Sequence, residues 1–586
     1  MAYEYVAPLA DMRFVIEQVL EAPRSWQACT VFAELDGDTA GAVLEEAARF
    51  ACQVLQPTNA PGDLEGCMLD AQGNVRTPAG YREAYRAFVA GGWPALPCDP
   101  AWGGQGLPLL LDAAMREMLS ACNHAWNMYP DLLHGAYETI KAHGSETLKG
   151  RYLGKVARGE VLAAMALTEP NAGSDLGSLR TRAVPQADGS VAVSGSKIFI
   201  SGADHDLTDD IVHLVLVRLP DAPAGSKGLS LALVPKFLPA ERGRGARNAW
   251  SVDGIEKKMG IKGSATCAVR YEGATGWLVG EPNRGLAAMF LMMNSARLHV
   301  GLQGLGHQEM ATQNALRYAL EREQFGKPIA ALPAMRHLLH RAMALTEAQR
   351  VIAYRAALAI DEAHHHEDAA QRESATALAA LLTPAVKAFC THQGFHVAAA
   401  AQQVFGGYGY VHEYGVEQTV RDARIAMVYE GTNEIQAIDL LQRKVLADGG
   451  RALAAWLAEC ESEADRVAAD AALADLAQAL REQIAATRAA TAVVQAAARV
   501  DAEAPLRAAD DYLLGFAHLL LAWAFAASAR AAAAQAAQSA AQSVGPFLPA
   551  KLERMRHGAQ QLLPQAAVHW QRVRACAQAL PMLRPP

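Results

Sequence analysis

The spacing of apolar residues changes twice along the chain. Over residues 36–162 apolar positions recur mostly at helical intervals, and turn-rich breaks such as residues 99–108 interrupt them. The pattern then alternates in short runs bounded by Gly, Pro or Asp, which predicts strands over 190–200, 211–219, 229–234 and 266–271. The helical period returns after residue 285 and predicts helices over 289–323, 333–362 and 373–401.

These changes divide the chain into five predicted segments. They are an arm over 1–35, a helical domain over 36–162, a strand-rich domain over 163–284, a second helical domain over 285–446 and a helical extension over 447–586. A chain of 586 residues is too long for one hydrophobic core, so three or four domains are expected. The short strands suit a small barrel or a sandwich.

The extension is rich in Ala, Gln, Arg and Leu, a composition that favours helices. Its most apolar stretch, residues 512–529, is just long enough to span a bilayer. Weakly apolar Ala residues, His518 near the middle and Arg530 directly after the stretch favour a buried helix, so we expect no integral membrane span. The acids and bases of the extension recur on apparent solvent faces, which predicts a structural domain without catalytic groups. A membrane anchor is the alternative.

Composition narrows the class of protein. The chain carries 53 Lys and Arg against 61 Asp and Glu, a formal charge of -8, which argues against a nucleic-acid binder. Nine cysteines without a C-x-x-C pair suit a reducing compartment and offer neither a disulfide framework nor a zinc site. The first residues lack a signal-peptide layout, which indicates the cytoplasm. We expect the histidines at 364–366 to lie in a solvated loop rather than bind metal, and Cys267 to be a core residue.

Three short motifs offer candidate chemistry. LTEPNAGSD (167–175) is a loop that could hold a polar ligand edge, and EREQFGKPI (321–329) ends a long helix with Arg322, which could pair with a phosphate. FGGYGY (405–410) precedes VYEGTNEIQ (428–436), where Thr432 is a plausible helix N-cap beside Glu430. Each motif alone is better explained by a connecting loop, a solvated helix end or a surface glutamate. No G-x-G-x-x-G follows a strand, so a Rossmann site is unsupported.

Together and in this order, the motifs resemble the acyl-CoA dehydrogenase family over residues 36–446. The resemblance implies a mainly α fold: an N-terminal helical domain, a central β-barrel domain and a four-helix domain, to which this chain adds the extra helical extension. The arm and the extension are similar to a longer bacterial subgroup that includes the 3-methylmercaptopropionyl-CoA dehydrogenases.

The resemblance implies FAD-dependent α,β-dehydrogenation of an acyl-CoA thioester to the trans-2-enoyl-CoA. Glu430 would remove the α-proton, the β-hydride would go to flavin N5, and an electron-transfer flavoprotein would accept the electrons. The backbone N–H of Glu430 and a flavin ribityl hydroxyl would hold the enolate oxygen. Burial beside substrate and flavin should raise the pKa of Glu430 from about 4.3. The substrate would be a fatty acyl-CoA or 3-methylmercaptopropionyl-CoA.

Further site residues follow from the same resemblance. Residues expected to contact FAD are Met165, Leu167, Thr168, Ser174, Phe199, Ser201, Arg322, Gln324, Phe325, Gln403, Gly407, Thr432 and Glu434. Phe199 stands where the family commonly has Trp, and Glu434 where many members have Gln. Residues expected to contact the substrate are Ser174, Asn294, Arg297 and Gly431; Asn294 replaces a frequent Asp, and a helix-surface arginine is the alternative for Arg297.

Arg322, Gln324 and Phe325 match positions that reach the FAD of a neighbouring subunit, which predicts at least a dimer. The helical tail tends to occupy the face used for tetramers, so a homodimer is favoured. Three competing hypotheses remain: an acyl-CoA oxidase, a nitroalkane-oxidase-like enzyme, which would carry Asp at position 430, and a non-catalytic acyl-CoA-binding protein.

Overall fold

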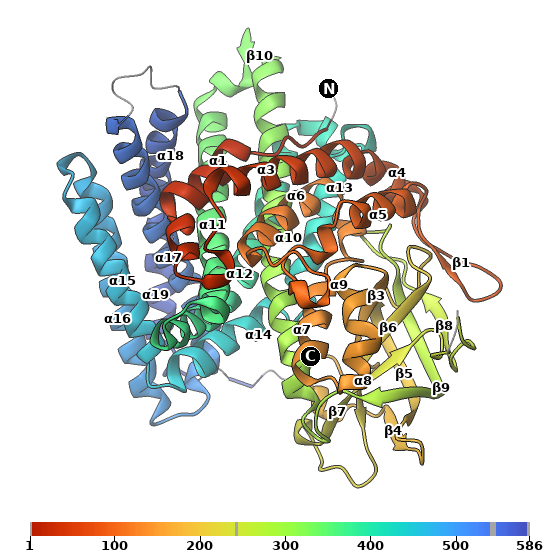
Figure 1. The fold of residues 1–586 in the computed structure, drawn as a ribbon. Coiled ribbons are helices and arrows are strands. Elements are labelled where there is room, and N and C mark those ends of the chain that lie inside the picture. Colours follow the sequence, from red (N-terminus) through yellow and green to blue (C-terminus); the bar gives the residue numbers. More distant parts are fainter. Residues whose placement is uncertain (1–2, 241–243, 539–545, 580, 583–586) are drawn as a thin grey trace. The chain divides into compact units, whose positions relative to one another are not determined.

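The computed structural model describes residues 3–240, 244–538, 546–579 and 581–582, and the chain forms two compact units (Figure 1). The first comprises residues 1–45 and 300–586, and we call it the helical unit. The second comprises residues 46–299, and we call it the mixed unit. The boundaries fall within helices α3 (Gly37–Phe50) and α10 (Gly285–Glu321).

The mixed unit begins with helices and continues into a sheet. α6 is buried along its whole length, and α7 and α9 pack on the first strand of the sheet. A small hairpin of β1 (Met68–Leu69) and β2 (Val75–Arg76) precedes them. The helices are α4 (Asn59–Glu65), α5 (Tyr81–Ala90), α6 (Leu109–Asn127), α7 (Leu133–His143), α8 (Glu146–Leu148) and α9 (Gly154–Ala157).

The sheet has seven strands in the order β3-β6-β4-β5-β9-β7, with β8 on β9 and a further pairing of β6 with β7. All four predicted strand segments are strands. The expected closed β-barrel is not confirmed: among the described residues, β4 and β6 are paired at one position, Arg182 with Arg218, and β7 and β9 at two. The strands are β3 (Val161–Ala166), β4 (Arg182–Pro185), β5 (Val191–Ser201), β6 (Asp210–Arg218), β7 (Leu229–Pro235), β8 (Trp250–Ile255) and β9 (Thr266–Leu278).

The helical unit holds the long helices predicted after residue 285 and the extension. α11 packs along α12, and α17 is the central helix of the extension, in contact with α11, α14, α15, α16, α18 and α19. A short hairpin, β10 (Glu323–Gln324) and β11 (Lys327–Pro328), follows α10. The helices are α1 (Leu9–Phe14), α2 (Ala22–Gln27), α11 (Pro333–His365), α12 (Ala369–Val404), α13 (Val416–Ala423), α14 (Asn433–Ile438), α15 (Arg451–Ala468), α16 (Ala474–Ala498), α17 (Ala504–Gln538), α18 (Phe547–Leu562) and α19 (Ala566–Arg574).

Two glycines let α10 and α12 cross at close range. A Cβ on Gly304 would lie 2.5 Å from the carbonyl oxygen of Cys390, and one on Gly394 would lie 2.4 Å from that of Gly304. Any side chain there would push the helices apart, so the crossing fixes the position of α12.

The apolar stretch 512–529 lies within α17, as the buried-helix interpretation predicts. By length and composition, α12 and α17 are the two described helices that could cross a membrane. In their most apolar windows, 72% of α12 and 94% of α17 is buried inside the protein. Core helices of soluble proteins pass the same test, so this composition is weak evidence for a membrane span.

The prediction that the charges of the extension lie on solvent faces is wrong at α18. Lys551 is 0% exposed and pairs with Asp11 of the arm and, at 2.8 Å, with Glu347 of α11. Asp11 also pairs with Arg350, whose second partner is Glu309 at 2.5 Å. Charged side chains are almost never fully buried without partners, and this network joins the arm, the central helices and the extension.

The histidine run and Cys267 lie close to where the sequence suggests. His364 and His365 are the last residues of α11 rather than loop residues, because the helical pattern continues to its end. Both are exposed, and His365 lies edge-on to Phe32 at 4.9 Å. Cys267 is fully buried in β9, as predicted.

Candidate active site

Glu430 lies in a strained turn of the helical unit. The turn joins the short helical segment Arg424–Met427 to α14, and Thr432 caps α14 by accepting a hydrogen bond from Ile435 N. The predicted N-cap is therefore confirmed. Glu430 has a φ of 55° and Gly431 a φ of 83°, and such a conformation costs a non-glycine residue about 1–3 kcal/mol. Strain of this kind clusters at functional sites.

The environment of the turn is polar. Glu430 and Thr432 are half-buried, while Glu434 is exposed on the first turn of α14. A hydrogen bond from Thr432 lowers the pKa of the Glu434 carboxyl, so this side chain carries a negative charge. A half-buried carboxylate on a fixed turn can act as a general base.

Four predicted FAD contacts meet in one pocket of the helical unit. Arg322 and Gln324 follow α10, and Gln403 and Gly407 come from the end of α12 and the turn after it. The pocket has a volume of about 710 Å³, and its wall includes the stacked rings of Tyr318 and Phe405. The guanidinium of Arg322 lies over the ring of Tyr408, 5.7 Å from its centre.

Phe325 lies at the tip of the β10–β11 hairpin and outside the lining of this pocket. Its φ is 55° and its side chain is 88% exposed. A bulky residue with a positive φ is a strained backbone position, and such positions cluster at functional sites, which makes Phe325 a candidate for a contact with another molecule.

In the mixed unit, the 167–175 loop and the end of β5 are joined by a buried ion pair. Lys197 is 0% exposed, and its Nζ donates to the carbonyl of Leu167 at 2.8 Å and to Glu169 at 3.0 Å. Ile198 N donates to the carbonyl of Thr168. The predicted residues Met165, Leu167 and Thr168 therefore lie on a segment that is fixed to the strand of Phe199 and Ser201.

Phe199 is presented to the outside by a β-bulge. The register of β5 and β9 shifts between Lys197 and Ile200, and Phe199 has a φ of 58° and is 58% exposed. Bulges re-aim side chains beside active sites. An exposed aromatic ring on a fixed strand can stack on a planar ligand. Ser201 is half-buried two residues further, and Ser174 is exposed on the loop.

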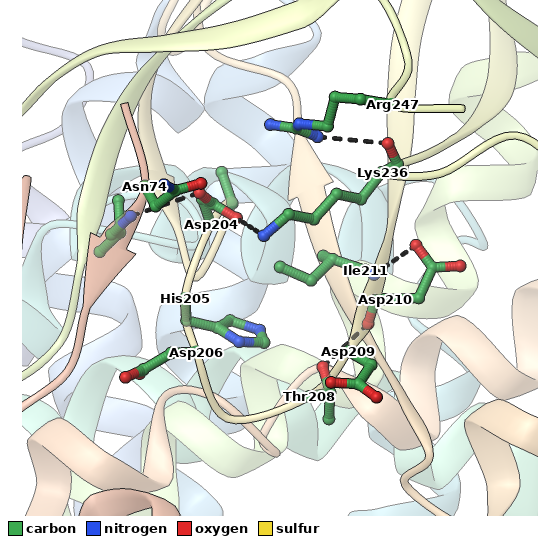
Figure 2. A network of polar contacts seen from close by, with 12 residues as sticks. Asn74, Asp204, His205, Asp206, Thr208, Asp209, Asp210, Ile211, Lys236 and Arg247 are labelled. Carbon is green, nitrogen blue, oxygen red and sulfur yellow. Dashed lines mark hydrogen bonds and ion pairs between the residues drawn. The ribbon is translucent and has the colours of Figure 1, made fainter. Parts of the chain in front are cut away.

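A polar network fixes the chain after Ser201 (Figure 2). Asp204 is fully buried and accepts two hydrogen bonds: one from the Lys236 ammonium at 2.5 Å, and one from the backbone N–H of Val75 in β2 at 3.4 Å. Arg247 donates to the carbonyl of Lys236, and Asp210 accepts from Ile211 N. No local motif marks the pair of Lys197 with Glu169 or the contacts of Asp204 with Lys236 and Val75, because these partners lie 28 to 129 residues apart in the sequence.

Arg297 and Asn294 lie one turn apart on the part of α10 that belongs to the mixed unit. Arg297 is 5% exposed and donates to Asn294 at 3.4 Å, so the helix-surface alternative for this arginine is wrong. Next to it, His299 contacts Asp131 at 3.1 Å and Asp112 at 3.5 Å. Burial alone would lower the pKa of His299, but these two carboxylates raise it to about 9.

The predicted residues thus fall into two groups. The helical unit holds Glu430 with Gly431, Thr432 and Glu434, and the pocket of Arg322. The mixed unit holds the 167–175 loop, the end of β5, and Arg297 with Asn294.

Comparisons with known proteins agree with this architecture. Models described as the N-terminal, middle and C-terminal domains of acyl-CoA dehydrogenase match residues 38–160, 164–274 and 283–446. A fourth, described as acetyl-CoA dehydrogenase C-terminal like, matches residues 456–583 in the extension.

Individual relatives cover most of the chain. The 3-methylmercaptopropionyl-CoA dehydrogenase of Ruegeria pomeroyi is 40% identical over 97% of this chain and 98% of its own length. A butyryl-CoA dehydrogenase of Syntrophomonas wolfei is 33% identical over 78% of this chain and 79% of its own length. The structure of Caenorhabditis elegans ACDH-11 in complex with C11-CoA has the same fold, with a TM-score of 0.75 at 18% identity over 96% of this chain and 92% of that one. The chain belongs to the acyl-CoA dehydrogenase family, in the longer subgroup that the Ruegeria protein represents.

Proposed function

We propose that the chain is a cytoplasmic enzyme that uses FAD to dehydrogenate an acyl-CoA thioester at the α,β bond, yielding the trans-2-enoyl-CoA. The observation that carries the proposal is the carboxylate of Glu430 on a strained turn with a φ of 55°, directly before a capped helix. An electron-transfer flavoprotein is the expected electron acceptor.

Glu430 is the base in this proposal. An α-proton of a thioester is weakly acidic, so its removal needs a positioned carboxylate and donors for the enolate oxygen. The proton moves from the α-carbon to the Glu430 carboxylate. A bound substrate would exclude water from the half-buried side chain, and a less hydrated carboxylate is a stronger base.

The residues present fit FAD. The 710 Å³ pocket has room for a nucleotide end, and within the described residues no carboxylate forms an ion pair with Arg322, which leaves its charge available for a phosphate. Phe199 and the 167–175 loop offer an exposed ring and a polar edge for a planar group. When bound, FAD supplies the two-electron chemistry that takes up the β-hydrogen as hydride.

We also propose a homodimer. Arg322, Gln324 and Phe325 match positions through which one subunit reaches the FAD of its neighbour, and Phe325 exposes 88% of its side chain. A two-fold interface would repeat this contact twice.

The proposed substrate is 3-methylmercaptopropionyl-CoA or a fatty acyl-CoA of similar length. The named activity of the relative that is 40% identical over nearly the full length supports the first, and that of the butyryl-CoA dehydrogenase relative the second. The proposed substrate contacts are Ser174, Asn294, Arg297 and Gly431.

A panel of acyl-CoAs assayed with a dye acceptor, with and without oxygen, tests the function. We expect reduction of the dye with a short acyl-CoA or the thioether acyl-CoA, at a rate that oxygen does not change. Turnover that needs oxygen and yields hydrogen peroxide would identify an oxidase, and binding without turnover of any acyl-CoA would identify a non-catalytic protein.

A further inference from the structure

A fully buried lysine contacts the turn that carries Glu430. Lys387 lies on α12, is 0% exposed, and donates from Nζ to the carbonyl of Gly431 at 2.8 Å and to Oδ1 of Asn433 at 3.0 Å. Lysine is among the residues least often buried completely, because its ammonium loses hydration. Its position under this turn therefore calls for an explanation.

A second buried side chain holds the same turn. Gln436 is 0% exposed, and its Nε2 donates to the carbonyl of Glu430 at 3.0 Å and to that of Gly431 at 3.4 Å. Donors from α12 and α14 thus converge on two successive carbonyl groups. A left-handed conformation at a residue such as Glu430 persists only where its surroundings fix it in several ways, and these donors do so.

The two contacts set the direction of the backbone. Peptide groups are planar and trans, so fixing a carbonyl oxygen also fixes the N–H of the following residue on the opposite side. Gln436 fixes the peptide after Glu430, and Lys387 fixes the next one. The N–H groups of Gly431 and Thr432 therefore point away from the two donors, and the Glu430 side chain leaves the turn in a defined direction.

Lys387 itself is held on a rigid base. Asn433 donates to the carbonyl of Ala388 at 3.1 Å, and Thr391 donates to Asn433 at 3.2 Å. One turn further along α12, Gly394 makes the close crossing with Gly304. The α12 backbone that carries Lys387 is thus fixed by helix packing, and Asn433 ties it to the start of α14.

We infer that Lys387 is a positioning residue for the base: its ammonium, with Gln436, holds the Glu430–Gly431 turn in the one conformation that directs the carboxylate at the substrate. The inference rests on the proposed function, in which Glu430 removes the α-proton. Lys387 takes no proton in it.

The test compares Lys387→Met with Lys551→Met in the full-length, FAD-loaded protein. Both changes remove a fully buried ammonium, but Lys551 pairs with Asp11 and Glu347 and does not touch the turn. We expect Lys387→Met to lower kcat by about 10²-fold, as misplacement by about 1 Å does, with KM nearly unchanged. The isotope effect with α-deuterated substrate should rise, since C–H cleavage becomes slower. Lys551→Met should keep kcat and the isotope effect per folded molecule.

Hydrogen–deuterium exchange of residues 428–437 gives a readout that does not depend on turnover. Uptake should rise in Lys387→Met and stay as in the unmodified protein in Lys551→Met. Gln436→Met, which removes no charge, should raise uptake and lower kcat as Lys387→Met does. It replaces Lys387→Met in the test if that variant does not fold. If kcat and deuterium uptake are unchanged in these variants, the inference about Lys387 is wrong, and the proposed function still stands. Failure of the unmodified protein to oxidise any acyl-CoA overturns the proposed function, and the exchange experiment still decides whether Lys387 holds the turn.

Discussion

The network around Asp11 allows a quantitative prediction about the extension. Asp11→Ala leaves Lys551 and Arg350 buried without a shared carboxylate. Breaking a buried ion pair costs about 3–5 kcal/mol. Lys551 keeps Glu347 at 2.8 Å, and Arg350 keeps Glu309 at 2.5 Å. We therefore expect the free energy of unfolding to fall by an amount near the lower end of this range, about 3 kcal/mol. That is about 10²-fold in the folding equilibrium.

Chemical denaturation followed by near-UV circular dichroism and by limited proteolysis of residues 447–586 measures this loss, since a chain of several domains need not unfold in one step. The matched control is Asp465→Ala on α15, whose exposed pair with Arg481 at 2.8 Å should contribute about 0–1 kcal/mol. If Asp11→Ala is as stable as Asp465→Ala, the network does not fasten the arm to the extension, and this reasoning is refuted.

Three further predictions concern the cofactor, pH and the membrane. Arg322→Ala should lose FAD during gel filtration, and its mass by light scattering should fall towards that of a monomer. If the variant keeps both FAD and the dimer mass, Arg322 is not part of the FAD site. Burial lowers the pKa of His518 to about 4, so its neutral form contributes stability above about pH 6.5 that is lost as the pH falls towards 4. His518→Gln should therefore flatten the pH dependence of unfolding in this window by up to about 1.4 kcal/mol per pH unit, and an unchanged slope would contradict the assignment. Because α17 is buried, the protein should stay in the supernatant with neutral and anionic liposomes, whereas sedimentation with lipid would identify an anchor.

Much of the fold follows from local pattern. The strands over 191–201 and 229–235 lie within one residue of their predicted limits, since alternation and bounding Gly or Pro residues are local signals. The cap at Thr432 is local in the same sense. Closure of the sheet is not, because it depends on pairing between strands distant in sequence, and the expected barrel is not confirmed.

The candidate site shows the same division. Arg322 and Gln403 come together in one pocket as the motifs suggest, although their roles stay predictions. Lys387 lies 43 residues before Glu430 in an ordinary helical pattern, so nothing in the sequence marks it. Asp11 and Lys551 are separated by 540 residues, and no periodicity links them.

Anaerobic reduction of bound FAD by acyl-CoA, followed by the loss of flavin absorbance, tests the central claim most directly. The unmodified protein and Glu482→Gln, which changes an exposed carboxylate on α16, should both be bleached rapidly. Glu430→Gln should bind FAD and acyl-CoA but be reduced at least about 10²–10⁴-fold more slowly, because the α-proton then has no base. Reduction of Glu430→Gln at a rate close to that of the unmodified protein would contradict the account and move the base to another residue.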